Sequence, residues 1–80
     1  MLSQELIRAD ESWSFIEVWT DTTAEIPYVL LLTGNETENC KIYDPAENYK
    51  IAFSCDTYEK AKLWLLEDEY VKVTGRIKQD

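Results

Sequence analysis

The stretch that decides the fold is residues 12–19, Ser-Trp-Ser-Phe-Ile-Glu-Val-Trp. A period of two, with aromatic and β-branched residues, predicts a β-strand. Neighbouring side chains of a strand point to opposite faces, so the three aromatic rings must share one face and Ile16 and Val18 the other. The strand therefore carries two apolar sides, and a single helix can cover only one of them.

Three more strands are expected before the helix. Residues 26–33 are apolar on both faces, as in a central strand covered on each side. Residues 40–43 and 49–54 flank the turn sequence Asp-Pro-Ala-Glu-Asn, in which the proline favours a tight corner. These two strands therefore predict a hairpin, with Ile51 and Phe53 on the same face.

A change of period marks the helix. Asp56 precedes Glu59 by three residues, which is the spacing of a capping box, where the first side chain accepts hydrogen bonds from the first amides of the helix. The spacing predicts a helix over residues 57–67, with Ala61 and Leu65 on its apolar face.

Residues 70–77 return to alternation and predict the last strand, with Val71 and Val73 inward and Tyr70 and Lys72 outward. The order β-β-β-β-α-β predicts an α+β fold, a mostly antiparallel twisted sheet with one long helix packed on one face. We expect the last strand to lie beside the first one. The side expected beneath the helix is largely aliphatic: Ile16, Val18, Ile42, Ile51, Phe53, Val71 and Val73.

The length predicts a single domain over residues 1–80. Residues 12–77 supply the sheet and the helix, and residues 1–10 form an N-terminal arm. Leu2 and Leu6 in that arm are spaced for a short helix, which would cover the second face of the sheet.

The chain has a net charge of −8, and its acids are unevenly placed. Residues 1–39 hold eight acidic residues against Arg8 alone. Such a surface repels phosphate backbones and anionic head groups, so neither nucleic acid nor a membrane is an expected partner, whereas a basic protein suits this charge. The apolar run 26–32 is too short to cross a membrane, and the first residues lack a signal-peptide pattern, so we expect a cytoplasmic protein.

Motifs that carry chemistry are scarce in this sequence. The chain has no histidine, which removes the commonest general base and the commonest metal ligand. Gly34 and Gly75 stand alone, so the sequence has no phosphate-binding glycine motif, and the two cysteines lack the spacing of a zinc site. We therefore predict no enzymatic activity, no catalytic residue, no cofactor and no metal site.

Cys40 and Cys55 are expected to lie near each other in the hairpin. If Ile42 stands opposite Ile51, then Cys40 faces Phe53 and Cys55 lies one diagonal step away. Reduced cysteine is among the most buried residue types, so two thiols packed in the core are favoured over a redox pair.

The face that carries the rings is the predicted interaction surface, because exposed Trp and Tyr side chains dominate binding hot spots. Its candidate residues are Trp13, Phe15, Glu17, Trp19, Tyr43 and Tyr70. The expected function is a small acidic interaction or regulatory module, whose partner is a basic protein or a second copy of the chain.

Other interpretations of this face stay open. In one interpretation residues 1–10 fold back over this face, and in another the face serves only to build a homo-oligomer. It could also form a shallow pocket at an oligomer seam, a small-ligand or enzymatic site with Glu17 as its polar group. In the simplest interpretation Glu17 only keeps an edge strand soluble.

Three segments in the second half of the chain also carry a resemblance. They are Lys41-Ile42-Tyr43-Asp44-Pro45, Asp56-Thr57-Tyr58-Glu59 and Leu63-Trp64-Leu65-Leu66-Glu67-Asp68-Glu69-Tyr70. These segments are a turn, a helix start and a helix exit, and they are similar to small conserved hypothetical proteins of cyanobacteria. The resemblance implies a bacterial, cytoplasmic, single-domain protein, and it implies no activity that these residues would carry.

Overall fold

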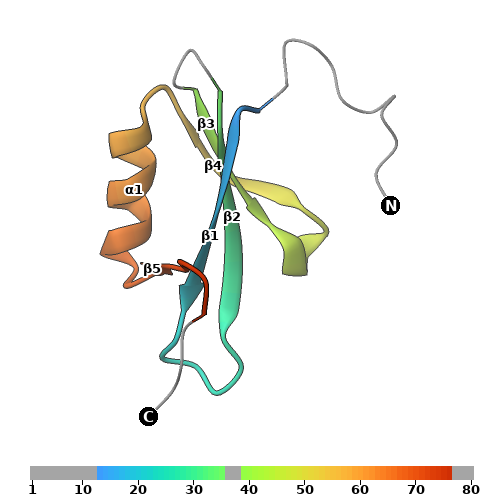
Figure 1. The fold of residues 1–80 in the computed structure, drawn as a ribbon. Helices are drawn as coiled ribbons and strands as arrows, with labels where there is room; N and C mark the ends of the chain where they lie inside the picture. The colour runs from blue at the N-terminus through green and yellow to red at the C-terminus, as the bar shows by residue number, and fades with distance from the viewer. Residues whose placement is uncertain (1–12, 36–38, 77–80) are drawn as a thin grey trace.

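The computed structural model describes residues 13–35 and 39–76, and within them it shows one five-stranded sheet and one α-helix (Figure 1). The elements are β1 (Phe15–Asp21), β2 (Tyr28–Gly34), β3 (Cys40–Asp44), the 3-10 helix η3 (Pro45–Glu47), β4 (Lys50–Cys55), α1 (Tyr58–Glu67) and β5 (Val71–Lys72). The predicted α+β class is confirmed. The predicted N-terminal arm and its short helix lie outside the described residues.

The strands lie side by side in the order β4-β3-β2-β1-β5, and every neighbouring pair is antiparallel. β1 and β2 pair along their whole length, from Phe15 opposite Gly34 to Asp21 opposite Tyr28. β5 contributes only two residues and lies beside β1, as expected for the last strand. The sheet is strongly twisted, so that the β3–β4 hairpin crosses the direction of β1 and β2 (Figure 1).

A bulge interrupts the β3–β4 hairpin. Tyr43 pairs with Ile51, but the preceding residue Ile42 pairs with Phe53, so Ala52 is an extra residue on β4. The predicted pairing of Ile42 with Ile51 is therefore wrong. A bulge reverses the alternation of the strand that carries it, and this is why Ile51 and Phe53 lie on opposite faces although they are two residues apart.

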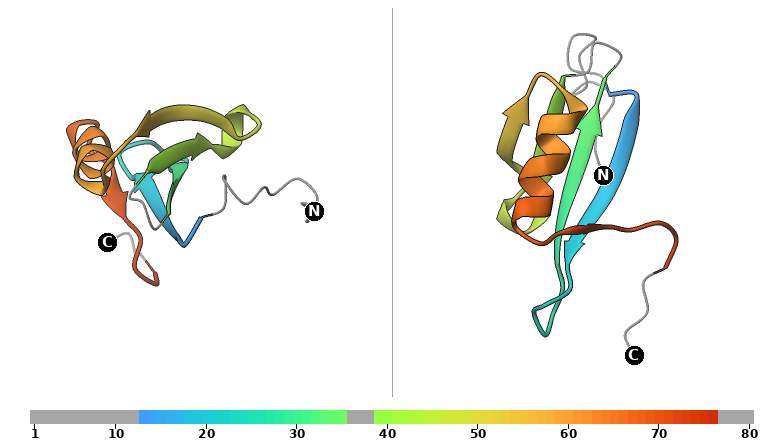
Figure 2. Two further views of the ribbon diagram at one scale, coloured as in Figure 1. Left: turned by 90° about the horizontal axis from the view of Figure 1, so that it is seen from above. Right: turned by 90° about the vertical axis from the view of Figure 1, so that its left-hand side faces the viewer.

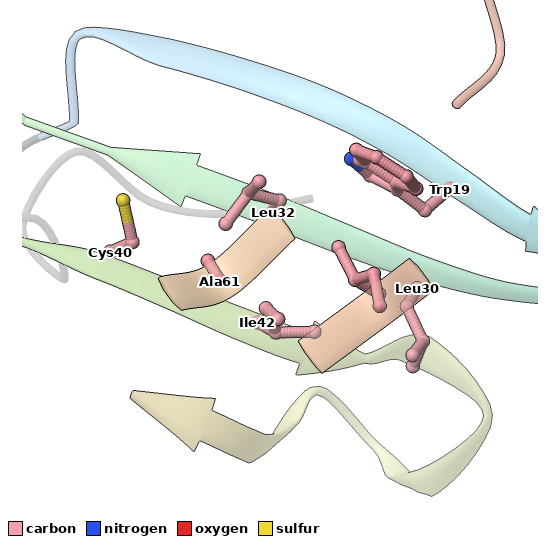
Figure 3. Close-up of a cluster of buried hydrophobic side chains, with 7 residues drawn as sticks. Trp19, Leu30, Leu32, Cys40, Ile42 and Ala61 are labelled. Carbon is pink, nitrogen blue, oxygen red and sulfur yellow. The ribbon is translucent and has the colours of Figure 1, made fainter. Parts of the chain in front are cut away.

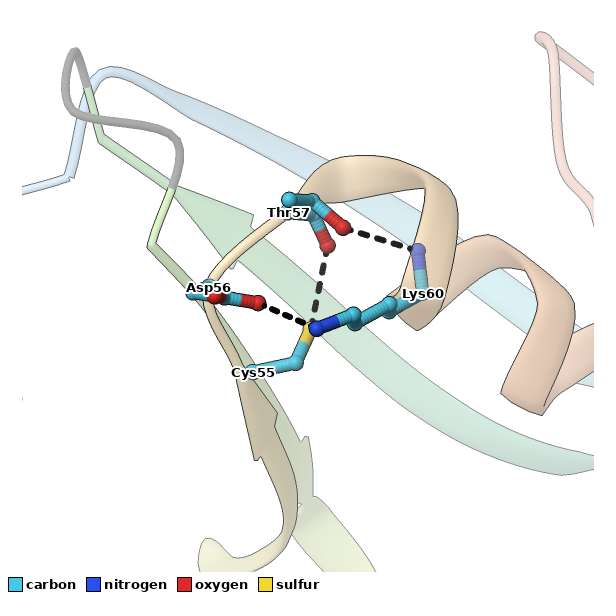
Figure 4. A network of polar contacts seen from close by, with 4 residues as sticks. All are labelled: Cys55, Asp56, Thr57 and Lys60. Atoms are coloured by element: carbon cyan, nitrogen blue, oxygen red, sulfur yellow. Dashed lines mark hydrogen bonds and ion pairs between the residues drawn. The ribbon is translucent and has the colours of Figure 1, made fainter.

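The N-cap of helix α1 lies one residue later than predicted. Thr57 is the N-cap, and its Oγ1 accepts a hydrogen bond from the amide of Lys60 at 3.3 Å (Figure 4). Asp56 instead forms an exposed ion pair with the Lys60 ammonium at 2.9 Å. The predicted apolar face of the helix is confirmed, because Ala61 and Leu65 are fully buried.

The helix covers the face of the sheet that carries the rings, which overturns the predicted sidedness. Trp19 is 2% exposed and belongs to one buried cluster with Ala61 and Leu65 of α1 (Figure 3). Ile16 and Val18, expected beneath the helix, are 45% and 36% exposed. The alternation of β1 is as predicted, but the opposite face turns inward.

The register explains why the rings turn inward. Trp19 stands opposite Leu30, and the neighbouring residues of the same face stand opposite Leu32 and Gly34. Leu30 and Leu32 are buried against α1, so antiparallel pairing carries the rings of β1 to the same side. A large ring also buries more apolar area than a β-branched side chain does, so this choice removes more surface from water.

The inward and outward faces of β5 are also opposite to those predicted, for the same reason. Thr20 pairs with Val71, and Trp19 pairs with Lys72, so the faces of β5 follow those of β1. Val71 is 42% exposed rather than inward, and Tyr70 packs against the core rather than outward. Figure 2 shows α1 on one side of the sheet, and we call the other side the open face.

Candidate functional site

Two of the predicted site residues, Glu17 and Trp19, form a polar cluster beneath the helix rather than an exposed surface, and a third, Phe15, packs beside it. The Glu17 carboxylate accepts hydrogen bonds from Trp19 Nε1 at 3.0 Å and from the Tyr58 hydroxyl at 3.0 and 3.1 Å. The Lys72 ammonium lies 3.4 Å from the same carboxylate. The ring of Phe15 packs edge-on against the ring of Tyr58 at a centroid distance of 5.9 Å.

The cluster joins three elements of the fold. Glu17 comes from β1, Tyr58 from the first turn of α1, and Lys72 from β5. Burial and the hydrogen bond to Glu17 raise the pKa of Tyr58 to about 12. Both carboxylate oxygens of Glu17 are engaged by these partners, so the Glu17 side chain contributes to the structure of the core. The interpretation of Glu17 as a solubilising residue on a wet face is therefore wrong.

The remaining predicted site residues lie in three different places. Tyr70 is half-buried against the core. Trp13 lies before β1 and is 52% exposed. Tyr43 is half-buried, and its pairing with Leu31 and Ile51 puts it on the open face. The six candidates therefore do not form one surface, because the face on which they were grouped is the one that α1 covers.

The exposed apolar surface lies on the open face, whereas the sequence predicts it on the face that carries the rings of β1. Its central row runs across four strands through the register pairs Val18–Leu31, Leu31–Tyr43 and Tyr43–Ile51. Above and below that row, further apolar side chains alternate onto the same side. The exposed members of the face are Ile16, Val18, Val29, Ile51 and Val71, each between 36% and 45% exposed.

Charge is nearly absent from the open face. The polar residues that the register places on it are Thr20, Thr33, Lys41 and Ser54. Among the described strands no carboxylate alternates onto this side, although the whole chain carries a net charge of −8. The sequence signal for this face is the pair Ile16 and Val18 between the rings of β1, which the alternation alone places beneath the helix.

The two cysteines meet at one end of the sheet. Cys40 pairs directly with Cys55 across the β3–β4 hairpin, so the predicted pairing of Cys40 with Phe53 is wrong. The bulge accounts for one residue of this two-residue difference, and the pairing of Ile51 with Tyr43 rather than with Ile42 accounts for the other. Both cysteines border an open cleft of about 360 Å³, which Trp13, Gly34 and Ser54 also line.

Within residues 13–35 and 39–76, no three side chains of the metal-ligating types gather at one place. In the same part of the chain, no helix has both the length and the apolar character needed to span a bilayer.

Comparisons of the chain with protein-family models, with curated proteins and with solved structures find no match. The resemblance to small cyanobacterial proteins stays a prediction.

Proposed function

We propose that this protein is a small protein-interaction module whose binding surface is the open face of its sheet. The observation that supports the proposal is the row of Val18, Leu31, Tyr43 and Ile51, which crosses four strands on the side that α1 does not cover. Contiguous apolar surface of this kind marks interaction sites in soluble proteins. This surface is not the aromatic face that the sequence predicts. The reason for expecting an exposed apolar surface is the same, because one helix covers only one face of the sheet.

We propose that the partner bound at this face is a second copy of the chain. An acidic protein repels its own kind, so self-association requires a contact surface that keeps carboxylates apart. The open face meets this requirement, because Lys41 is the single charged residue that the described register places on it. Two such faces would stack as the sheets of a β-sandwich do, about 10 Å apart.

The polar cluster does not favour the ligand-binding alternative. A ligand that used Glu17 would have to displace Trp19, Tyr58 and Lys72 from its carboxylate. We also propose that the chain is not an enzyme and that it is cytoplasmic.

The experiment is a measurement of solution mass by light scattering at micromolar and millimolar concentrations. We expect the mass to rise from 9.4 kDa toward twice that value as concentration increases. Val18→Lys places a charge in the central row and should hold the protein at the monomer mass. Leu63→Lys is the matched control, because Leu63 is 58% exposed on α1, away from the open face.

A second variant protects the test against misfolding. Ile51→Lys changes a 45% exposed residue on the edge strand β4, and it should abolish the dimer while keeping the circular dichroism of the wild type. A wild-type protein that stays monomeric at every concentration would overturn the choice of a second copy. A dimer that survives both substitutions would place the contact elsewhere and overturn the role of the open face.

A further inference from the structure

The two cysteines of the chain stand at one register position of the sheet. Cys40 on β3 and Cys55 on β4 are directly opposed, and both are reduced thiols in the structure. Residues opposed across antiparallel strands have Cα atoms about 4.5 or 5.5 Å apart, depending on the hydrogen-bonding pattern. Both separations fall within the range of about 4.4–6.8 Å that a disulfide spans.

The two thiols differ in accessibility. Cys40 is 1% exposed and belongs to the buried core, whereas Cys55 is partly exposed. The Cys55 thiol donates a hydrogen bond to the carbonyl of Thr57 at 3.1 Å, just before α1 begins (Figure 4). An incoming reagent therefore meets Cys55 first.

We propose that Cys40 and Cys55 form a redox-active dithiol whose oxidant is a low-molecular-weight disulfide of the glutathione type. The Cys55 thiolate attacks one sulfur of that disulfide, a mixed disulfide forms on Cys55, and the first small thiol leaves with a proton. The Cys40 thiolate then attacks the Cys55 sulfur, and the second small thiol leaves with a proton. The protein loses two electrons and two protons, and the small disulfide gains them.

The placement favours this chemistry over two unrelated buried thiols. The chain contains only two cysteines, and the β-bulge brings them into direct register. If Ala52 were paired with Ile42 instead of bulged, Cys40 would face Ser54, the neighbour of Cys55, and the second attack would lose its geometry. The site is independent of the open face, because Cys40 and its register partner lie on the side that α1 covers.

The test equilibrates the full chain with mixtures of reduced and oxidised glutathione, followed by acid quenching, alkylation and intact mass measurement. We expect a single product that has lost two hydrogen atoms and carries neither an alkyl group nor glutathione. Because the folded register holds the thiols together, the equilibrium constant should exceed that of the urea-unfolded chain by about tenfold or more. This comparison needs no variant, so it does not depend on how a substitution affects folding.

Two variants test the assigned roles. Cys40→Ser should stop at one glutathione on Cys55, whereas Cys55→Ser should keep its Cys40 thiol unreacted until the protein is unfolded. Three results would each overturn the proposal: a dithiol that stays reduced in excess oxidised glutathione, a wild type that accumulates a stable mixed disulfide, or disulfides formed between chains.

Discussion

The ring of Phe15 on β1 lies close against Gly34 of β2. Phe15 is the register partner of Gly34 on β1. A Cβ atom built on Gly34 would collide with Cε1 and Cζ of the Phe15 ring. Glycine is therefore required here by the close approach of a side chain rather than by an unusual backbone angle. The ring in turn packs against Tyr58 of the helix, so this contact supports the union of helix and sheet.

Gly34→Ala is expected to destabilise the protein by about 1–3 kcal/mol, the usual range for an overpacked site. Urea unfolding followed by tryptophan fluorescence measures the effect. The matched variant is Phe15→Leu, which removes the ring that Gly34 accommodates. Gly34→Ala should lose most of its effect in the Phe15→Leu background, and two effects that simply add would contradict the contact.

The individual residues that the sequence predicted well are those of the helix. Ala61 and Leu65 were expected on its apolar face, and both are fully buried. The cap was displaced by one residue, because Thr57 and Asp56 can both accept from a first-turn amide and local spacing does not choose between them. The contacts of Glu17 could not be predicted, because its partners Tyr58 and Lys72 are distant in sequence.

At the scale of elements, the hydroxyl of Tyr58 links α1 to β1. It donates to Glu17, and burial together with this bond raises the pKa of Tyr58 to about 12. Tyr28 on β2 donates to Asp44 at the end of β3, and that bond raises its pKa to about 12 as well. Both tyrosines therefore hold their protons more tightly in the folded protein than in the unfolded chain.

The free energy of unfolding should consequently fall as pH rises from 10 to about 12. In that window the unfolded chain releases protons that the folded chain keeps, so the unfolded state gains stability. Tyr58→Phe removes one of these protons, and its unfolding free energy should fall less steeply over the same window. Below pH 10 the variant should differ from the wild type by a constant offset. Parallel profiles up to pH 12 would contradict the role of Tyr58.

The sequence predicted the elements far better than their relations. Local patterns located the strands, the turn and the helix, since each depends on near neighbours. The bulge at Ala52 was missed because nothing in the local alternation marks an inserted residue, and it changed the partners of Ile42 and Cys40. The reversed faces of β5 followed from its register with β1, which is a tertiary property.

At the scale of the whole molecule, the missing information was which side of the sheet the helix would cover. The alternation of β1 showed two apolar faces and was right about their members, but either could have been the core. The choice depended on Leu30 and Leu32, whose strand is apolar on both sides and so gives no signal by itself. Only the register of β1 with β2 decides it.

The net charge of −8 makes a prediction that belongs to the whole molecule. Raising NaCl from about 0.01 M to about 0.1 M shortens the screening distance from about 30 Å to about 10 Å. If the occupant of the open face is a second copy, this change should tighten the dimer, because it weakens repulsion between like-charged chains. Sedimentation equilibrium at both salt concentrations measures the dissociation constant. A dimer that weakens with salt would show that opposite charges hold it, and a basic partner would then fit the surface better.

The extra residue in β4 also decides how the chain tolerates change. Ile51 and Phe53 look equivalent in the sequence, yet the first is 45% exposed and the second stacks on Trp64 of α1 at 5.0 Å. A polar substitution at the first position spares the interior, while the same substitution at the second opens it. One inserted alanine thus gives two similar hydrophobic residues, separated by a single position, entirely different tolerances to substitution.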